Sequence, residues 1–124
     1  MPPEPKRVLI VDDEPGIREV LSEALKLKKY RTVMAVNGQD GLEKAIECLP
    51  DLILLDVMMP VMDGWEMLAR LHKDERTRDI PVVMLTARGD TEALIRSEHD
   101  RAVDYFIKPI DLKELLSFVQ RYIH

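Results

Sequence analysis

The stretch Asp51-Leu52-Ile53-Leu54-Leu55-Asp56 decides the fold class of this chain. The four residues between the two aspartates are all apolar, so a strand formed here has no polar face and is buried on both sides. Strands of this kind lie in the middle of parallel sheets. Asp56 then stands at the exit of a central strand, where open α/β sheets bind their ligands.

Five strand-like runs alternate with helical patterns along the chain. The strands are expected near 7–11, 31–36, 51–55, 81–86 and 104–107. Apolar residues recur at helical spacing in four clear stretches, namely Ile17, Val20, Leu21, Ala24 and Leu25; Leu42, Ala45, Ile46 and Leu49; Trp65, Leu68 and Leu71; and Leu112, Leu115, Leu116 and Val119. This alternation predicts an α/β fold with a doubly wound five-stranded parallel sheet and five helices.

The expected fourth helix, between Arg88 and Arg101, has the weakest pattern. Its apolar residues are confined to Ala93-Leu94-Ile95. Because so little apolar area offsets the entropy lost on ordering, we expect this helix to be less firmly packed than the others. The neighbouring helices have clearer signals, since Pro15 fits the first turn of the first helix and Asp111 is placed to cap the fifth.

Composition places the chain among single globular domains. It has 124 residues, of which 46% are hydrophobic and 33% charged, and a net charge of −5. We therefore expect one domain over residues 1–124 that does not bind nucleic acid directly. No apolar stretch approaches the roughly 20 residues of a membrane span. The single cysteine, Cys48, cannot form an internal disulfide, which favours a reducing, cytoplasmic location, and a buried hydrophobic role is favoured over a redox thiol.

Chemically reactive side chains stand at four strand exits. Asp12 and Asp13 follow the first strand, Asp56 follows the third, Thr86 ends the fourth and Lys108 follows the fifth. If the first and third strands are neighbours, three carboxylates repel one another, and a hard divalent cation such as Mg²⁺ relieves the repulsion. Taken singly, each side chain has an ordinary interpretation as a helix cap, a strand end or a surface charge. Their convergence at one sheet edge favours phosphoryl chemistry with a metal.

Asp56 has the position of a nucleophile. A carboxylate that attacks phosphorus forms an acyl phosphate, and a metal offsets the charge of the transition state. Lys108 would pair with the phosphoryl oxygens as a point charge, because Pro109 fixes a sharp turn that aims it at the sheet edge. A backbone carbonyl of the loop 58–64 would complete a metal shell, and the methionines of this loop are equally compatible with core packing.

Four motifs closely resemble the receiver domain of bacterial two-component response regulators. They are Val-Leu-Ile-Val-Asp-Asp-Glu at 8–14, Leu-Leu-Asp-Val-Met-Met-Pro at 54–60 with Asp63-Gly64, Val-Met-Leu-Thr-Ala at 83–87, and Asp-Tyr-Phe-Ile-Lys-Pro at 104–109. The resemblance runs from about Lys6 to the end of the chain, and four motifs in this order and spacing are highly specific. It implies a flavodoxin-like sheet with strand order 2-1-3-4-5.

The resemblance also implies a role for each site residue. Asp56 is implied to be the phosphoacceptor, which receives phosphate from a phosphohistidine of a sensor histidine kinase or phosphotransfer protein. The implied Mg²⁺ ligands are Asp12, Asp13, Asp56 and the backbone carbonyl of Met58. Thr86 and Lys108 are implied to contact the phosphoryl group. Tyr105 would be the switch residue that turns inward when Thr86 moves toward the phosphate. The Lys108-Pro109 bond is expected to be cis, and Met58 and Arg88 hold positions that tune the lifetime of the phosphate in relatives.

In this interpretation the protein is a signalling switch and not an enzyme acting on other molecules. It would catalyse transfer to its own Asp56 and slow hydrolysis from it, and would signal to an output domain or a downstream protein. Relatives dimerise or dock partners through the fourth helix and fifth strand, so a phosphorylation-dependent homodimer is one expected assembly. Arg101 stands where relatives usually carry a glycine, and this departure bears on the output surface. The chain is expected to be either a single-domain regulator or the receiver of a longer one.

Three other functions fit the sequence less well. A receiver-like adaptor that binds its partner without phosphorylation is the main alternative, but it would not need the complete set of acidic and basic residues. An aspartyl phosphatase of the haloacid-dehalogenase type needs Asp-x-Asp at the first strand exit, where this chain has Asp12-Asp13-Glu14. A dinucleotide site is not indicated, since no Gly-x-Gly-x-x-Gly follows the first strand.

Overall fold

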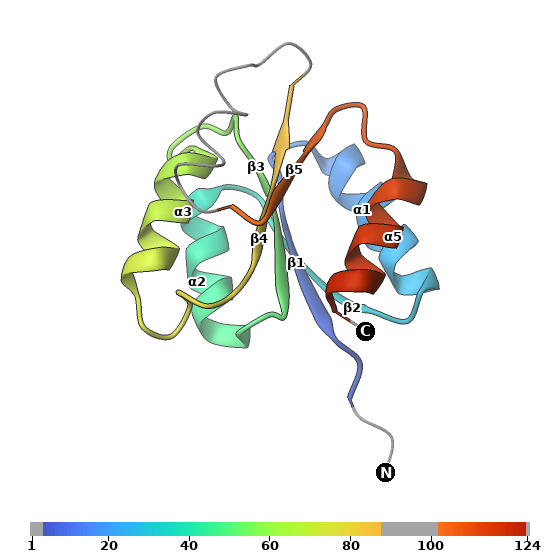
Figure 1. Ribbon diagram of the computed structural model, residues 1–124. Helices are drawn as coiled ribbons and strands as arrows, with labels where there is room; N and C mark the ends of the chain where they lie inside the picture. Colours follow the sequence, from blue (N-terminus) through green and yellow to red (C-terminus); the bar gives the residue numbers. More distant parts are fainter. Residues whose placement is uncertain (1–3, 88–101, 124) are drawn as a thin grey trace.

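The computed structural model describes residues 4–87 and 102–123 and shows a sheet between two layers of helices (Figure 1). Five parallel strands are ordered β2-β1-β3-β4-β5. Their bounds are β1 Arg7–Val11, β2 Arg31–Ala35, β3 Leu52–Asp56, β4 Val82–Thr86 and β5 Asp104–Ile107. The doubly wound sheet and its order are confirmed, and the strand bounds agree with the expected ones to within one residue.

Helices cover both faces of this sheet. The described helices are α1 Pro15–Leu27, α2 Gly38–Cys48, α3 Gly64–Lys73 and α5 Leu112–Tyr122. α2 and α3 lie on one face, and α1 and α5 lie on the other (Figure 1). The expected fourth helix and Arg101 fall outside the described residues, so four helices stand where five were expected. None of the described helices is long and apolar enough to cross a membrane.

The three central strands form the middle of the core. Every residue of β3 and β4 is buried, and in β1 only Arg7 is partly exposed. Side chains alternate between two apolar clusters, so that Ile53 and Leu55 face α2 and α3 while Leu52 and Leu54 face α1 and α5. This burial on both sides explains why the sequence of β3 has no polar face.

Local signals fix where the helices begin. Pro15 occupies the first turn of α1, as the sequence predicts. Asn37, Asp63 and Asp111 cap α2, α3 and α5, because their side chains accept hydrogen bonds from backbone N–H groups of the first turn. The predicted cap at Asp111 is thereby confirmed, and Asp63 turns the chain into α3 shortly after Asp56.

The end of α2 differs from its predicted pattern. Leu49 was predicted to belong to the buried stripe of this helix, and that prediction is wrong. It is the C-cap residue, with φ of 44°, and it is 54% exposed. A left-handed residue ends the helix just before Pro50 and turns the side chain off the stripe. Cys48 is only half-buried. Met59 and Met62 of the loop after β3 are both buried in the core.

Gly64 lies where the loop between β3 and α3 passes closest to the end of β3. A Cβ atom at this position would collide with the carbonyl oxygen of Asp56 and with Cα of Val57. The Gly64 N–H also donates to the carbonyl of Val57 at 2.9 Å. Because the colliding atoms belong to the backbone, only glycine lets α3 begin directly against the strand end that carries Asp56.

We expect Gly64→Ala to lower the free energy of unfolding by about 1–3 kcal/mol, because the backbone must shift to admit the methyl group. Gly16→Ala is the matched control, since a Cβ there meets nothing within 4 Å and alanine favours a helix by up to about 1 kcal/mol. Urea denaturation measures both variants. Equal stability of the two would contradict the close approach at Gly64.

Candidate functional site

The sheet register brings the acidic strand exits together. β1 pairs with β3, with Val11 opposite Leu55, so Asp12 and Asp56 leave neighbouring strands side by side. Asp12, Asp13 and Asp56 each offer a carboxylate oxygen, and these three oxygens lie within 4.8 Å of one another. The predicted convergence of the three carboxylates is therefore present in the structure.

The three carboxylates differ in burial. Asp12 is 0% and Asp56 3% exposed, whereas Asp13 is exposed. The N-cap residue of α1 is Glu14, so both aspartates precede the helix; Asp12 Oδ1 accepts a hydrogen bond from the Glu14 N–H at 2.9 Å. Two buried carboxylates side by side are costly unless a positive charge compensates them.

Lys108 supplies that positive charge. Its backbone N–H donates to the carbonyl of Thr86 at 2.7 Å, and its bond to Pro109 is cis, as expected. Its Nζ lies 3.0 Å from Asp12 Oδ2 and 3.3 Å from Asp56 Oδ1. No aligned hydrogen-bond donor from the described residues reaches Asp12 Oδ2. The contact of Asp12 Oδ2 with Lys108 is thus chiefly an attraction between charges.

The pKa of Asp56 reflects its burial and the nearby carboxylate of Asp12. Burial, and then the negative charge of Asp12, raise the pKa of Asp56 from 3.8 to about 7, against the opposing effects of Lys108 and of the Met58 N–H. Burial works to lower the pKa of Lys108, but its contacts with Asp12 and Asp56 together outweigh that effect and raise it. The lysine is therefore held as a cation, and it compensates the carboxylates only in part.

The donor set suits a hard divalent cation. Three carboxylates meet at one point, one of their buried oxygens has no aligned donor from the described chain, and the pKa of Asp56 is raised to about 7. Oxygen ligands with excess negative charge are what Mg²⁺ prefers in proteins. The Met58 N–H donates to Asp56 Oδ1 at 3.3 Å, so the backbone of the loop after β3 also borders the site.

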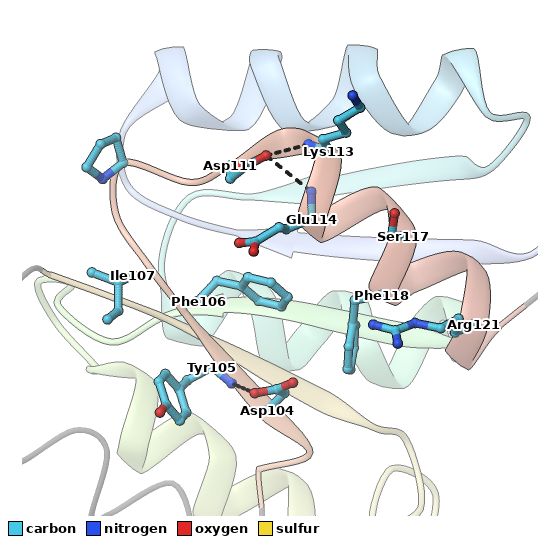
Figure 2. A pocket seen from close by; sticks show the side chains of 11 residues that line it. Asp104, Tyr105, Phe106, Ile107, Asp111, Lys113, Glu114, Ser117, Phe118 and Arg121 are labelled. Atoms are coloured by element: carbon cyan, nitrogen blue, oxygen red, sulfur yellow. Dashed lines mark hydrogen bonds between the residues drawn. The ribbon is translucent and has the colours of Figure 1, made fainter.

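Thr86 and Tyr105 lie on the neighbouring strands. Thr86 ends β4, is 1% exposed and stands opposite Ile107 of β5. Tyr105 stands opposite Met84 and is half-buried against the core beneath α2 and α3. Figure 2 shows Tyr105 beside a groove of about 670 Å³ that runs along β5 and α5. The buried threonine thus ends the strand next to β3, and the half-buried tyrosine lies on the following strand at an open surface.

Two residues that the sequence did not single out also contact the site. Glu14 Oε1 lies 3.5 Å from Lys108 Nζ, and Arg18 Nη1 donates to the carbonyl of Asp12 at 2.7 Å. Glu14 is the N-cap residue of α1 and Arg18 lies in its first turn. The acidic run at 12–14 was a signal for Glu14, whereas the direction of the Arg18 side chain depends on how α1 docks on the sheet.

A family profile described as the response regulator receiver domain matches residues 8–120. This chain belongs to the response regulator receiver family. The predicted resemblance is confirmed, and the chain is a receiver domain of the two-component response regulators. Such receivers act as signalling switches.

Relatives of known function support this assignment. Over 114 residues, or 92% of this chain, it is 44% identical to the DNA-binding dual master transcriptional regulator RpaA of Synechocystis, and over 112 residues, or 90%, it is 43% identical to the phosphate regulon transcriptional regulatory protein PhoB of Pseudomonas aeruginosa. Those matches cover 47% and 49% of the relatives. The chain therefore spans about half the length of these two regulators.

Solved structures of receivers have the same fold. The chemotaxis protein CheY4 of Vibrio cholerae superimposes with a TM-score of 0.89 at 31% identity, covering 96% of this chain and 99% of that one. The receiver domain of the Francisella response regulator 1452 gives 0.86 at 29% identity, covering 94% and 95%. The two-layered packing around the sheet is thus the architecture of receiver domains.

We expect Asp56 to lower the free energy of unfolding of the metal-free receiver as the pH rises from about 4 to 7. In this window the unfolded carboxyl, with a pKa of 3.8, has ionised while the folded one, near 7, resists ionisation. Asp56→Asn removes the charge and should therefore be more stabilising at pH 8 than at pH 5, by roughly 1 kcal/mol after solvent screening, or roughly 4 °C.

Thermal unfolding with a chelator present measures the difference. Asp79→Asn, at an exposed aspartate, controls for the loss of one negative charge. An Asp56→Asn gain that is the same at both pH values would show that burial does not disfavour the Asp56 carboxylate.

Proposed function

We propose that Asp56 accepts a phosphoryl group from a phosphohistidine of a sensor histidine kinase or phosphotransfer protein. The observation that carries the proposal is the meeting of Asp12, Asp13 and Asp56 within 4.8 Å beside the ammonium of Lys108. In a member of the receiver family, this cluster supplies a nucleophile and a compensating cation at one sheet edge.

The transfer follows from the positions of these groups. An Asp56 carboxylate oxygen attacks phosphorus, the bond from phosphorus to the donor imidazole nitrogen breaks, and its electron pair stays on that nitrogen. Lys108 Nζ, 3.0 Å and 3.3 Å from the two buried carboxylates, then pairs with the phosphoryl oxygens. Asp56 must be ionised to attack, and its raised pKa means that added positive charge increases the reactive fraction at neutral pH.

Asp12, Asp13, Asp56 and the backbone carbonyl of Met58 would hold a magnesium ion. When bound, Mg²⁺ offsets the negative charge that gathers on the phosphoryl oxygens. Asp12 contributes the buried oxygen that no aligned donor reaches, and Asp13 contributes from the exposed side of the cluster. Their role is to fix the ion against Asp56, so that nucleophile and incoming group meet in one orientation.

Thr86 and Tyr105 would convert phosphorylation into a surface change. Thr86 is buried at the end of β4 and would donate its hydroxyl to a phosphoryl oxygen. Tyr105 is half-buried on β5, beside the groove formed with α5, and would turn further inward when Thr86 moves (Figure 2). The change at the groove would be read by an output domain, a downstream protein or a second phosphorylated copy.

The remaining assignments complete the proposal. Residues 1–124 form one receiver domain, which catalyses its own phosphorylation and slow dephosphorylation and has no substrate other than its phosphodonors. RpaA and PhoB are transcriptional regulators about twice as long as the matched segment, which supports coupling to an output segment. A cytoplasmic location follows from the proposed exchange with a kinase and stays a prediction.

We expect incubation with acetyl phosphate and Mg²⁺ to add the mass of one phosphoryl group. Asp56→Asn should abolish the gain, and chelation of the metal should slow it at least about tenfold, because the carboxylate cluster then lacks its main counter-charge. Intact-protein mass spectrometry measures both effects. Asp63→Asn is the matched control in the same loop, since Asp63 caps α3. Phosphorylation of the Asp56→Asn variant at an unchanged rate would overturn the assignment of the phosphoacceptor.

Thr86→Ala should separate phosphorylation from switching. We expect this variant to gain the phosphoryl group while Tyr105 stays half-buried, because the hydroxyl that couples the two is missing. The ring resonances of Tyr105, followed by NMR with and without phosphodonor, report the change. Ser117→Ala, at the groove on α5, is the control for removal of a hydroxyl. An inward shift of Tyr105 of normal size in Thr86→Ala would contradict the coupling.

A further inference from the structure

The edge strand β2 turns to the outside of the sheet backbone groups that no other described strand pairs. β2 lies at the end of the sheet and pairs only with β1 among the described strands. The Arg31 N–H donates to the Lys6 carbonyl and the Ala35 carbonyl accepts from the Asp12 N–H, so residues 31, 33 and 35 bond inward. Because groups alternate along a strand, the N–H and C=O of Thr32 and Met34 and the N–H of Val36 point outward.

The outer strand has the composition of a segment that pairs readily. Residues 32–36 read Thr-Val-Met-Ala-Val, with no charge, no proline and no glycine. Met34 and Val36 are 38% and 47% exposed. An uncharged strand rich in β-branched residues with a free backbone edge is a template for strand addition by another chain.

A second copy of this chain fits such an edge by its own symmetry. Two β2 edges related by a twofold axis pair antiparallel, and a pairing centred on Met34 uses the N–H and C=O of that residue in both copies. The flanking bonds use the N–H of Val36. The Met34 carbonyl and the Val36 N–H are therefore the groups on which this pairing depends.

Two side chains of α2 already occupy those groups. Lys44 Nζ donates to the Met34 carbonyl at 2.6 Å, and Asp40 Oδ2 accepts from the Val36 N–H at 3.0 Å. The two side chains also contact each other at 3.3 Å. The cap of α2 holds this arrangement in place, since the Asp40 N–H donates to Asn37 Oδ1 at 2.8 Å. An acceptor and a donor of the strand edge are thus both satisfied from within the molecule.

The arrangement is more than an ordinary surface ion pair. Glu66 and Arg70 on α3 have the same spacing of four residues and the same 3.3 Å contact, and exposed pairs of this kind stabilise a helix only slightly. In the pair on α2, each partner makes a second bond to the backbone of the edge strand. Those second bonds join α2 to the edge strand and occupy two of its outward backbone groups, the Met34 carbonyl and the Val36 N–H.

We propose that Asp40 and Lys44 form a guard that closes the β2 edge against strand addition by a second copy of this chain. The guard keeps this edge of the sheet out of self-association, so that assembly of the receiver is left to other surfaces. It uses no side chain of the cluster formed by Asp12, Asp13, Asp56 and Lys108, and it does not depend on the phosphoacceptor role.

The double variant Asp40→Ala/Lys44→Met tests the proposal, with Glu66→Ala/Arg70→Met as its matched control. Sedimentation velocity over a concentration series, without phosphodonor, measures self-association. The variant frees two hydrogen-bonding groups in each copy, and the twofold pairing uses those of both copies, so the association constant should rise at least about tenfold. We expect that rise in the α2 variant and none in the α3 variant. Loss of the guard should also abolish protection of the Val36 amide in hydrogen exchange on the dilute monomer.

A third substitution locates the contact. Met34→Pro removes an outward N–H that makes no bond to β1, and proline is tolerated at such edge positions. Added to the α2 double variant, it should restore the monomer. If the double variant does not fold, Lys44→Met alone repeats the test with the N-terminal turn of α2 intact. A folded variant without the guard that stays monomeric, or self-association that survives Met34→Pro, would overturn the proposal.

Discussion

The structure depends on holding two buried carboxylates side by side at the end of a parallel sheet. The register of β1 against β3 leaves no other place for Asp12 and Asp56, and the pKa of Asp56, raised to about 7, records the resulting repulsion. Lys108, which follows β5, compensates part of this negative charge. The site is therefore short of positive charge, and this shortage is what makes it suitable for a metal ion and a phosphoryl transfer.

The scaffold around this cluster is almost fully buried on one side and only partly buried on the other. β1, β3 and β4 are buried almost throughout, and Gly64 allows α3 to begin directly against Asp56. β5, by contrast, is only partly buried, and Tyr105 borders an open groove. Elements that change conformation come from the less buried parts of a fold. A buried candidate phosphoacceptor beside a partly buried edge strand fits the division of roles that a switch requires.

The two edge strands of the sheet, β2 and β5, differ in how neighbouring groups cover them. β2 has an acceptor and a donor satisfied by Lys44 and Asp40, while β5 is flanked by α5 and leaves a groove along its length. A signalling domain that associates through one edge gains specificity if the other edge cannot pair. The proposed guard would prevent pairing at β2, while the groove leaves β5 and α5 open to a partner.

The sequence alone predicted the doubly wound parallel sheet, because strands buried on both faces and helices with one apolar stripe leave strong periodic signals. The strand order came from the resemblance to receiver domains. The polar residues at the strand exits predicted that Asp12, Asp13 and Asp56 meet at one sheet edge beside Lys108. Leu49 was misassigned, since apolar spacing does not show where a left-handed residue ends a helix. Only the tertiary structure decided that Glu14 reaches Lys108, that Arg18 holds the carbonyl of Asp12, and that Lys44 and Asp40 reach over the edge of β2. These contacts join side chains to groups on other elements, and their partners are set by how helices dock on the sheet, which local patterns do not encode.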